Sequence, residues 1–241
     1  MIGDLLTMMW KGWKDLFLYR GGVLSTLVVL GVFGILQPWE GGPEYLDGPF
    51  MPVILIWLPL FMVATMTADS FAGERERHTL ETLLVSRLSD RAILFGKIAA
   101  LVSYGWGLVL ANMLLALLTI NLVHGHGRWL MIPANTLVVI IAMSLLASWL
   151  AATGGVLISL RAATVRRAQQ TLTVTLLVLI FGMMYGGRSL PAEWKSALAA
   201  LFAGPNLVKA ELIAGAILVV VDAGLLVAAM ARFQRARLIL D

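Results

Sequence analysis

The sequence predicts an all-α membrane protein with six transmembrane helices, and three observations point to this class. Hydrophobic residues make up 60% of the 241 residues and charged residues only 13%, with a mean hydropathy of +0.89. A soluble domain usually carries about 25% charged residues, so one soluble core cannot bury this apolar content. Long apolar runs also alternate with short charged ones. In lipid, the backbone groups of a single apolar segment find hydrogen-bond partners only within a helix.

Six segments are long and apolar enough to span a bilayer, which needs roughly 20 mainly apolar residues. The fourth segment is long enough to tilt or to extend past the bilayer, and the first is short and ends at Gln37-Pro38. No repeat relates the two halves and no Pro/Ser-rich linker divides the chain, so we expect a single domain over residues 1–241. The expected spans are residues 21–37, 49–68, 98–122, 129–160, 169–187 and 210–231.

Basic residues predict the orientation, because cytoplasmic loops of membrane proteins are enriched in Lys and Arg. With the N-terminus in the cytoplasm, an even number of spans also places the C-terminus there. The four basic residues then left on the outer side are Arg128, Arg188, Lys195 and Lys209. We therefore expect a multi-pass protein of the cell (cytoplasmic or inner) membrane with both termini inside. The net charge of +4, distributed in this way, favours membrane lipid as a partner. We expect no nucleic-acid partner.

Two amphipathic segments flank the spans. Residues 1–20 lack the pattern of a signal peptide. Leu6, Trp10, Trp13 and Phe17 form one apolar stripe, which predicts a helix in the cytoplasmic interface ending at Gly21-Gly22; a plain start of the first span is the alternative. Residues 188–206 predict a short helix that either dips into the outer leaflet or lies on the surface.

A charged run over residues 69–84 separates the second and third spans. Glu74, Arg77, His78 and Glu81 fall at helical spacing on one face, and leucines fall on another. Ser89-Asp90 then provides an N-cap and an acid for the first turn of the next helix. The pattern alone predicts an amphipathic cytoplasmic helix over 74–88, which could equally be a solvated helix at the lipid headgroups.

The residues Phe71-Ala72-Gly73-Glu74-Arg75-Glu76-Arg77-His78-Thr79-Leu80-Glu81-Thr82-Leu83-Leu84, followed by Gly96-Lys97, resemble the ABC type-2 transporter permease family. Its members carry a similar Gly-Glu-Arg-Glu, Thr-Leu-Glu, Leu-Leu and Gly-Lys series between spans two and three. The whole layout is also similar, although Leu88 stands where the family commonly has Pro. The resemblance implies the permease subunit of an ATP-driven exporter, and therefore a protein that is not an enzyme by itself.

In that family the helix between spans two and three docks on the ATPase subunit. The resemblance therefore implies a coupling helix, two copies of an ABC ATPase subunit and a second permease, identical or related. Gly96-Lys97 lacks the remainder of a phosphate-binding loop, so we expect no cofactor in this chain, and ATP and Mg on the partner ATPase. The implied docking residues are Glu74, Arg75, Glu76, Arg77, His78, Leu80, Glu81, Leu83, Leu84 and Arg87.

Several polar and sulfur-containing residues within the spans are candidates for a transport pathway. Asp222 is an acid near mid-span, where an ionisable group is costly, with Asn112 as its candidate partner; it is either functional or a structural lock between helices. Polar residues at the start of span five suit either substrate entry or contacts between helices. Methionines could form an adaptable apolar lining or be ordinary lipid-facing residues. The pathway candidates are Met62, Met66, Asn112, Gln169, Thr173, Met183 and Asp222.

Three functions compete. The first is an exporter permease for a hydrophobic or amphipathic substrate such as a drug, lipid or peptide. The second is a non-transporting scaffold or sensor that recruits a cytoplasmic partner. The third is an intramembrane enzyme, which the absence of hydrolase and metalloprotease motifs disfavours. The segment His124-Gly125-His126 contains two histidines but no third metal ligand nearby, which favours a turn over a metal site.

Overall fold

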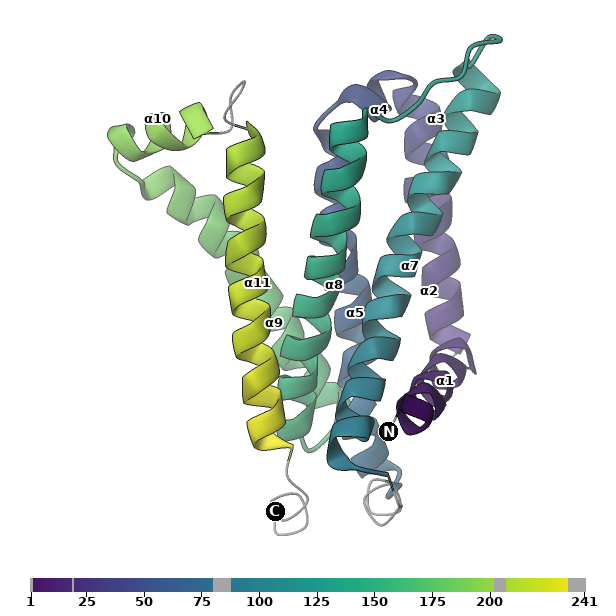
Figure 1. The fold of residues 1–241 in the computed structure, drawn as a ribbon, viewed down its shortest axis with the longest axis vertical. Helices are drawn as coiled ribbons and strands as arrows, with labels where there is room; N and C mark the ends of the chain where they lie inside the picture. Colours follow the sequence, from purple (N-terminus) through teal and green to yellow (C-terminus); the bar gives the residue numbers. More distant parts are fainter. Residues whose placement is uncertain (1, 19, 80–87, 202–206, 234–241) are drawn as a thin grey trace.

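The computed structural model describes residues 2–18, 20–79, 88–201 and 207–233, and every regular element within them is helical. Figure 1 shows long helices running side by side, with short helices at one end. The elements are α1 (Ile2–Leu18), α2 (Arg20–Gly31), the π-helix η1 (Val32–Leu36), α3 (Gln37–Gly41), α4 (Glu44–Asp47), α5 (Phe50–Glu76), α7 (Asp90–His124), α8 (Ala134–Arg161), α9 (Val165–Ser189), α10 (Ala192–Leu201) and α11 (Leu207–Arg232).

Among the described residues, six helical stretches are long and apolar enough to cross a membrane, which confirms the predicted number of spans. Their bounds differ from the predicted ones, for example at the starts of the third and fourth helices. The third helix starts at Asp90, eight residues before the apolar run, where Ser89 Oγ accepts a hydrogen bond from the Ala92 N–H. This confirms the predicted N-cap. The fourth helix starts at Ala134, after Pro133, so residues 129–133 form a connection.

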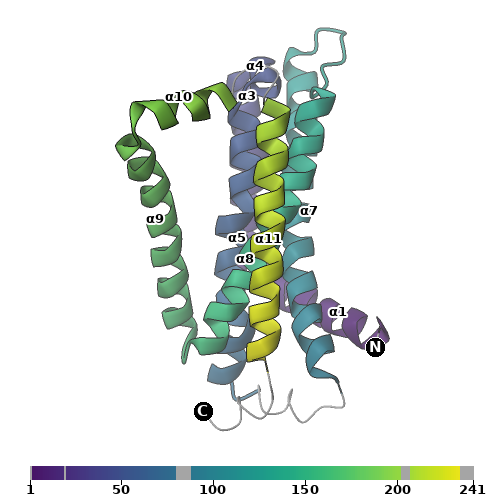
Figure 2. The same cartoon turned by 60° about the vertical axis from the view of Figure 1, so that its left-hand side comes forward.

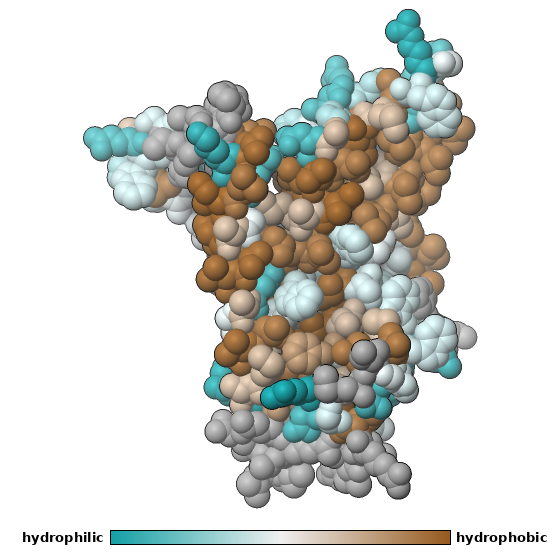
Figure 3. All heavy atoms as spheres, viewed as in Figure 1, coloured by the Kyte–Doolittle hydropathy of each residue, from teal (hydrophilic) through white to brown (hydrophobic). Residues whose placement is uncertain are grey.

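The core of the bundle consists of α5, α7 and α8 (Figure 1). α5 and α8 pack most extensively, because small residues let their backbones approach. A Cβ added at Gly155 of α8 would lie 2.6 Å from Thr67 Cγ2 of α5. On either side of this core, α2 packs against α7 and α11 packs against α8. Figure 3 shows the result: apolar residues cover most of the length of the visible face, and hydrophilic residues gather toward its two ends.

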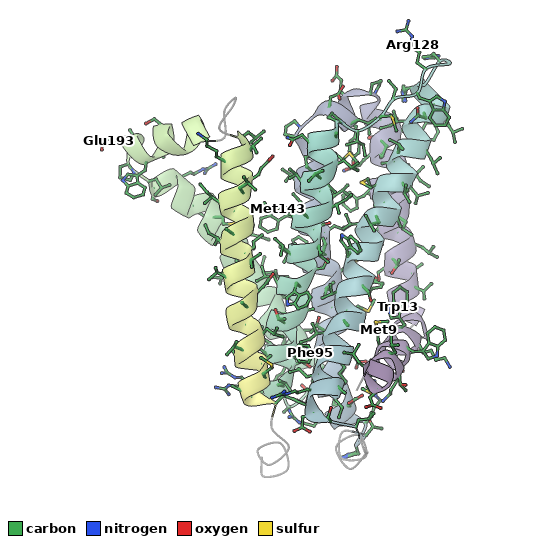
Figure 4. All side chains as sticks on the ribbon, in the orientation of Figure 1. Met9, Trp13, Phe95, Arg128, Met143 and Glu193 are labelled. Atoms are coloured by element: carbon green, nitrogen blue, oxygen red, sulfur yellow. The ribbon has the colours of Figure 1, made fainter. Side chains whose placement is uncertain are left out.

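The two ends of the bundle differ. We call the end where α1, the C-terminus of α5 and the N-terminus of α7 meet the charged end; the C-terminus of α11 also lies there (Figure 1). Arg128 and Glu193 lie at the opposite end, whereas Met9 and Trp13 of α1 lie near the charged end (Figure 4). The loop at the opposite end that carries His126 is a turn, with His126 in the left-handed region at φ 41°.

α1 lies across the bundle axis and packs on α7 (Figure 2). A Cβ added at Gly12 would lie 2.7 Å from Ala100 Cβ, so this contact is close. Trp13 Nε1 donates to Ser103 Oγ at 2.9 Å, while Leu6 and Trp10 on the predicted stripe are exposed. The helix break does not fall on Gly21-Gly22 as predicted, because α1 ends at Leu18 and both glycines belong to α2.

α9 diverges from the other long helices toward the opposite end, and α10 connects it with α11 (Figure 2). Its buried residues are Ala168 and Leu172, and both lie among its first eight residues. The predicted short helix between spans five and six is present as α10. The first span is also irregular, since the π-helix η1 interrupts it where Thr119 Oγ1 donates to the Gly34 carbonyl at 3.1 Å.

Candidate functional site at the charged end

A cavity of about 510 Å³ opens at the charged end between α1, α2, α5, α7 and α9. Apolar residues, among them Met62, Met66 and Leu101, form part of its wall. The rest is strongly polar and carries charges of both signs. The charged lining residues are Lys11, Asp15, Asp69, Glu74, Glu76, Arg77 and Lys97.

Glu74 forms the centre of a buried ion cluster in this cavity wall. Its Oε2 lies 3.0 Å from Lys97 Nζ and its Oε1 lies 3.4 Å from Lys11 Nζ. The Glu74 and Lys97 side chains are each only 9% exposed. Lys97 also donates to the Ser70 carbonyl and lies 4.1 Å from the centroid of the Phe71 ring. The cluster therefore connects α1, α5 and α7 through one buried carboxylate, which pairs with the buried Lys97 and the half-exposed Lys11.

Arg77 and Asp69 form a second, exposed ion pair. The two guanidinium nitrogens donate to the two carboxylate oxygens at 3.2 and 3.1 Å. This hydrogen bonding to Asp69 raises the pKa of Arg77 above its ordinary value, so the guanidinium stays charged. Because both side chains are about half exposed, the pair contributes little to stability, about 0.2–1 kcal/mol.

The last turn of α5 is also bonded to α8 and α9. Arg75 donates to the carbonyls of Ala162 and Leu160 at the C-terminus of α8, at 2.6 and 3.2 Å. These are carbonyls that the end of a helix leaves without an intrahelical donor. Glu76 Oε1 accepts from the Val165 N–H at the start of α9, at 3.1 Å. One short stretch of α5 therefore contacts four other helices.

The prediction of a separate helix beginning at Glu74 is wrong for the described residues. Glu74, Arg75 and Glu76 form the last turn of α5, and the backbone then turns, with His78 in the left-handed region at φ 55°. Consequently Glu74 does not share an exposed helical face with Arg77 and His78. The remaining implied docking residues, Leu80, Glu81, Leu83, Leu84 and Arg87, lie outside the described residues.

A second, mainly apolar groove of about 380 Å³ runs between α5 and α9. It brings together three of the predicted pathway residues, Met62, Gln169 and Thr173. Met62, Thr65 and Gln169 line both the groove and the cavity, so the two hollows adjoin. A fourth pathway candidate, Met66, lines the cavity alone.

The other pathway candidates lie away from these hollows. Met183 is 62% exposed on α9 and lines neither hollow. Asn112 is buried on α7 beside Gly34 of η1, and its amide donates to the Leu108 carbonyl. Asp222 is buried on α11, and neither of its carboxylate oxygens has a hydrogen-bond partner among the described residues. Asn112 is therefore not the hydrogen-bond partner that we predicted for Asp222.

Sequence reasoning missed Lys11, Asp69 and Lys97 as parts of one site. Their positions, 58 and 28 residues apart along the chain, give no local pattern that would connect them. A signal for Glu74 did exist: Thr67, Phe71 and Glu74 follow i, i+4, i+7 spacing, and all three are buried. This spacing continues the buried face of the second span into the charged run.

Comparison with protein families decides the class. A family model described as ABC-2 family transporter protein matches residues 42–203, which is more than half of the chain. The chain belongs to the ABC-2 transporter family. No curated protein matches the sequence.

The matched part of this ABC-2 protein runs from α4 through α10, so it includes the α5–α9 groove and the Glu74–Lys97 pair, while Lys11 on α1 lies outside it. The protein is thus a multi-pass membrane protein and the membrane component of a transporter, a kind that generally works with an ABC ATPase.

Proposed function

We propose that this chain is the permease subunit of an ATP-driven exporter that moves a hydrophobic or amphipathic substrate out of the cytoplasm. In this proposal the charged end faces the cytoplasm of a cell membrane, and both termini are inside. α1 lies in the cytoplasmic interface and α10 in the outer leaflet. Two permeases, identical or related, assemble with two ATPase subunits, which bind ATP and Mg and hydrolyse the ATP.

The observation that carries the proposal is the set of bonds around the last turn of α5. Glu74 pairs with Lys97 of α7, Arg75 bonds the end of α8, and Glu76 bonds the start of α9. The segment that follows directly, through Arg87, is the proposed docking element. A partner that moves this segment would therefore move the ends of several spans together, which is how a rigid-body shift passes between packed elements.

The proposed pathway is the α5–α9 groove together with the cavity at the charged end. The groove offers apolar and methionine side chains, which adapt to substrates of varied shape. Gln169 and Thr173 add hydrogen-bonding groups at its side. Met183, Asn112 and Asp222 lie away from this groove. In an assembled transporter they are candidates for pathway residues only at other positions.

The first test is co-purification of the tagged chain from its native membrane, with the captured proteins identified by mass spectrometry. We expect an ABC ATPase subunit with the native chain, and ATP hydrolysis that a substrate stimulates. In an Arg77→Ala/His78→Ala/Glu81→Ala variant the ATPase should be lost, because these residues lie on the proposed docking element. The matched control is Arg128→Ala/Lys195→Ala, which removes charge from the opposite end and should keep the ATPase.

Two outcomes would contradict the proposal. One is a folded chain that captures no ATPase from its native membrane. The other is an ATPase that binds the native chain and the docking variant equally well. An ATPase that binds without any effect of candidate substrates on hydrolysis would favour the scaffold or sensor function instead.

A further inference from the structure

We infer that the adjoining cavity and groove form one binding site for a cationic amphiphile, with an ammonium headgroup in the cavity and an alkyl chain along α5 and α9. The inference rests on the proposed function, because it names the substrate class of the same pathway. Three conditions must hold for such a site. The hydrophilic hollow must meet the apolar one, the hydrophilic hollow must prefer a cation, and the apolar hollow must be long enough for an alkyl chain.

The two hollows meet at Met62, Thr65 and Gln169, which line both. On the cavity side of this junction lie charged side chains. On the groove side lie Phe61, Leu172, Leu176, Leu177 and Ile180. A molecule that filled both hollows would therefore need a charged or polar end and an apolar end. Thr65 and Gln169 provide hydrogen-bonding groups at the junction, where the polar end of such a molecule would join its apolar end.

The charge of the cavity favours a cation. The three lining bases form ion pairs with two carboxylates: Lys11 and Lys97 both pair with Glu74, and Arg77 pairs with Asp69. Two lining acids remain without an ion pair among the described residues, Asp15 and Glu76, and Glu76 accepts only the Val165 N–H. With four acids against three bases, the side chains in the lining carry a net charge of −1. An ammonium group that entered the cavity would neutralise this charge, with Asp15 and Glu76 as its candidate partners, whereas an anion would add to it.

The length of the groove suits a medium alkyl chain. Gln169 and Ile180 at its two ends on α9 are about 16 Å apart at the helical rise. Apart from Gln169 and the Thr65 and Thr173 hydroxyls, the lining side chains are apolar, so burial of an alkyl chain there is favourable.

The test is native mass spectrometry of the purified full-length chain in a neutral sugar detergent, with three competing probes of equal chain length: dodecylammonium, dodecanol and dodecyl sulfonate. We expect the native chain to retain dodecylammonium about threefold to tenfold better than dodecanol, since each partly exposed ion pair contributes modestly. Asp15→Asn/Glu76→Gln should reduce this ratio to about one. The matched control, Glu193→Gln/Glu211→Gln, removes two acids elsewhere and should keep the ratio.

A second variant tests where the alkyl chain lies. Thr173→Trp fills the α5–α9 groove and should lower retention of all three probes, while melting temperatures verify that each variant is folded. Equal retention of the probes by the native chain, a preference for the sulfonate, or no effect of Thr173→Trp would each overturn the inference. The assay contains no ATPase, so a failure to capture an ATPase in the earlier test would leave this result standing, and the reverse also holds.

Discussion

At the scale of single residues, the buried charges around Glu74 are the most consequential feature. A charge taken out of water is tolerable only with a partner at close range, and both Lys97 and Lys11 supply one. The Phe71 ring below Lys97 adds a cation–π contact. Because the partners come from three helices, the cluster fixes the register of α1 and α7 against the end of α5.

Removal of one charge from this cluster should destabilise the protein more than removal of both. Lys97→Met leaves Glu74 buried beside only the half-exposed Lys11, and the cost of such an uncompensated charge is about 3–5 kcal/mol. We expect a clear fall in the melting temperature in detergent for Lys97→Met, and partial recovery in Glu74→Gln/Lys97→Met. A double variant no more stable than Lys97→Met would contradict the pairing.

Helices are the next scale, and here the sequence predicts the spans better than their ends. Six apolar runs correspond to the six long helical stretches, because hydropathy reports the lipid-facing part directly. The helices continue past those runs, since α5 extends through Glu76 and α7 starts at Asp90. Hydropathy cannot detect these extensions, because a charged residue occurs equally in a loop and in a helix that leaves the membrane.

The site was predictable only in part for the same reason. Gln169, Thr173 and Met62 were recognisable as polar or adaptable residues within spans, and they do line one groove. The partners of Glu74 depend on how α1 and α7 pack against α5, which no local spacing encodes. The residues that define the cavity are therefore a property of the tertiary packing.

Close packing of α5 on α8 makes a prediction about glycine. Gly155→Ala would place a Cβ 2.6 Å from Thr67 Cγ2, so the two helices must separate, at a cost of about 1–3 kcal/mol. Gly182→Ala on α9 meets nothing within 4 Å and is the matched control. Thermal unfolding in detergent should show a lower melting temperature for Gly155→Ala alone. Equal melting temperatures would mean that this contact is not tight in solution.

At the scale of the whole molecule, the two ends of the bundle have different charge. Basic residues concentrate at the charged end. Arg128 lies at the opposite end (Figure 4), as do α10 with Lys195, the last turn of α9 with Arg188 and the first turn of α11 with Lys209 (Figure 1). This asymmetry supports the proposed orientation. The chain contains no cysteine, so single thiols can be introduced without any background.

Thiol labelling tests the orientation directly. We expect Ser196→Cys on α10 to react with a membrane-impermeant maleimide in intact cells, and His78→Cys to react only after the membrane is opened. Both sites are exposed in the structure, so both should react fully in detergent, which is the control. The reverse pattern of labelling would place the charged end outside the cell and contradict the proposed topology.

The unequal burial of α9 has a mechanical consequence. Its buried residues, Ala168 and Leu172, lie near the charged end, and the helix continues to Ser189 beyond them. The distance from Leu172 to Ser189 is about 25 Å at the helical rise. A rotation of about 10° around Leu172 would therefore carry the tip at Ser189 through about 4 Å. α9 thus has the proportions of a lever, in which a small displacement beside Glu76 becomes a large one at the far membrane surface.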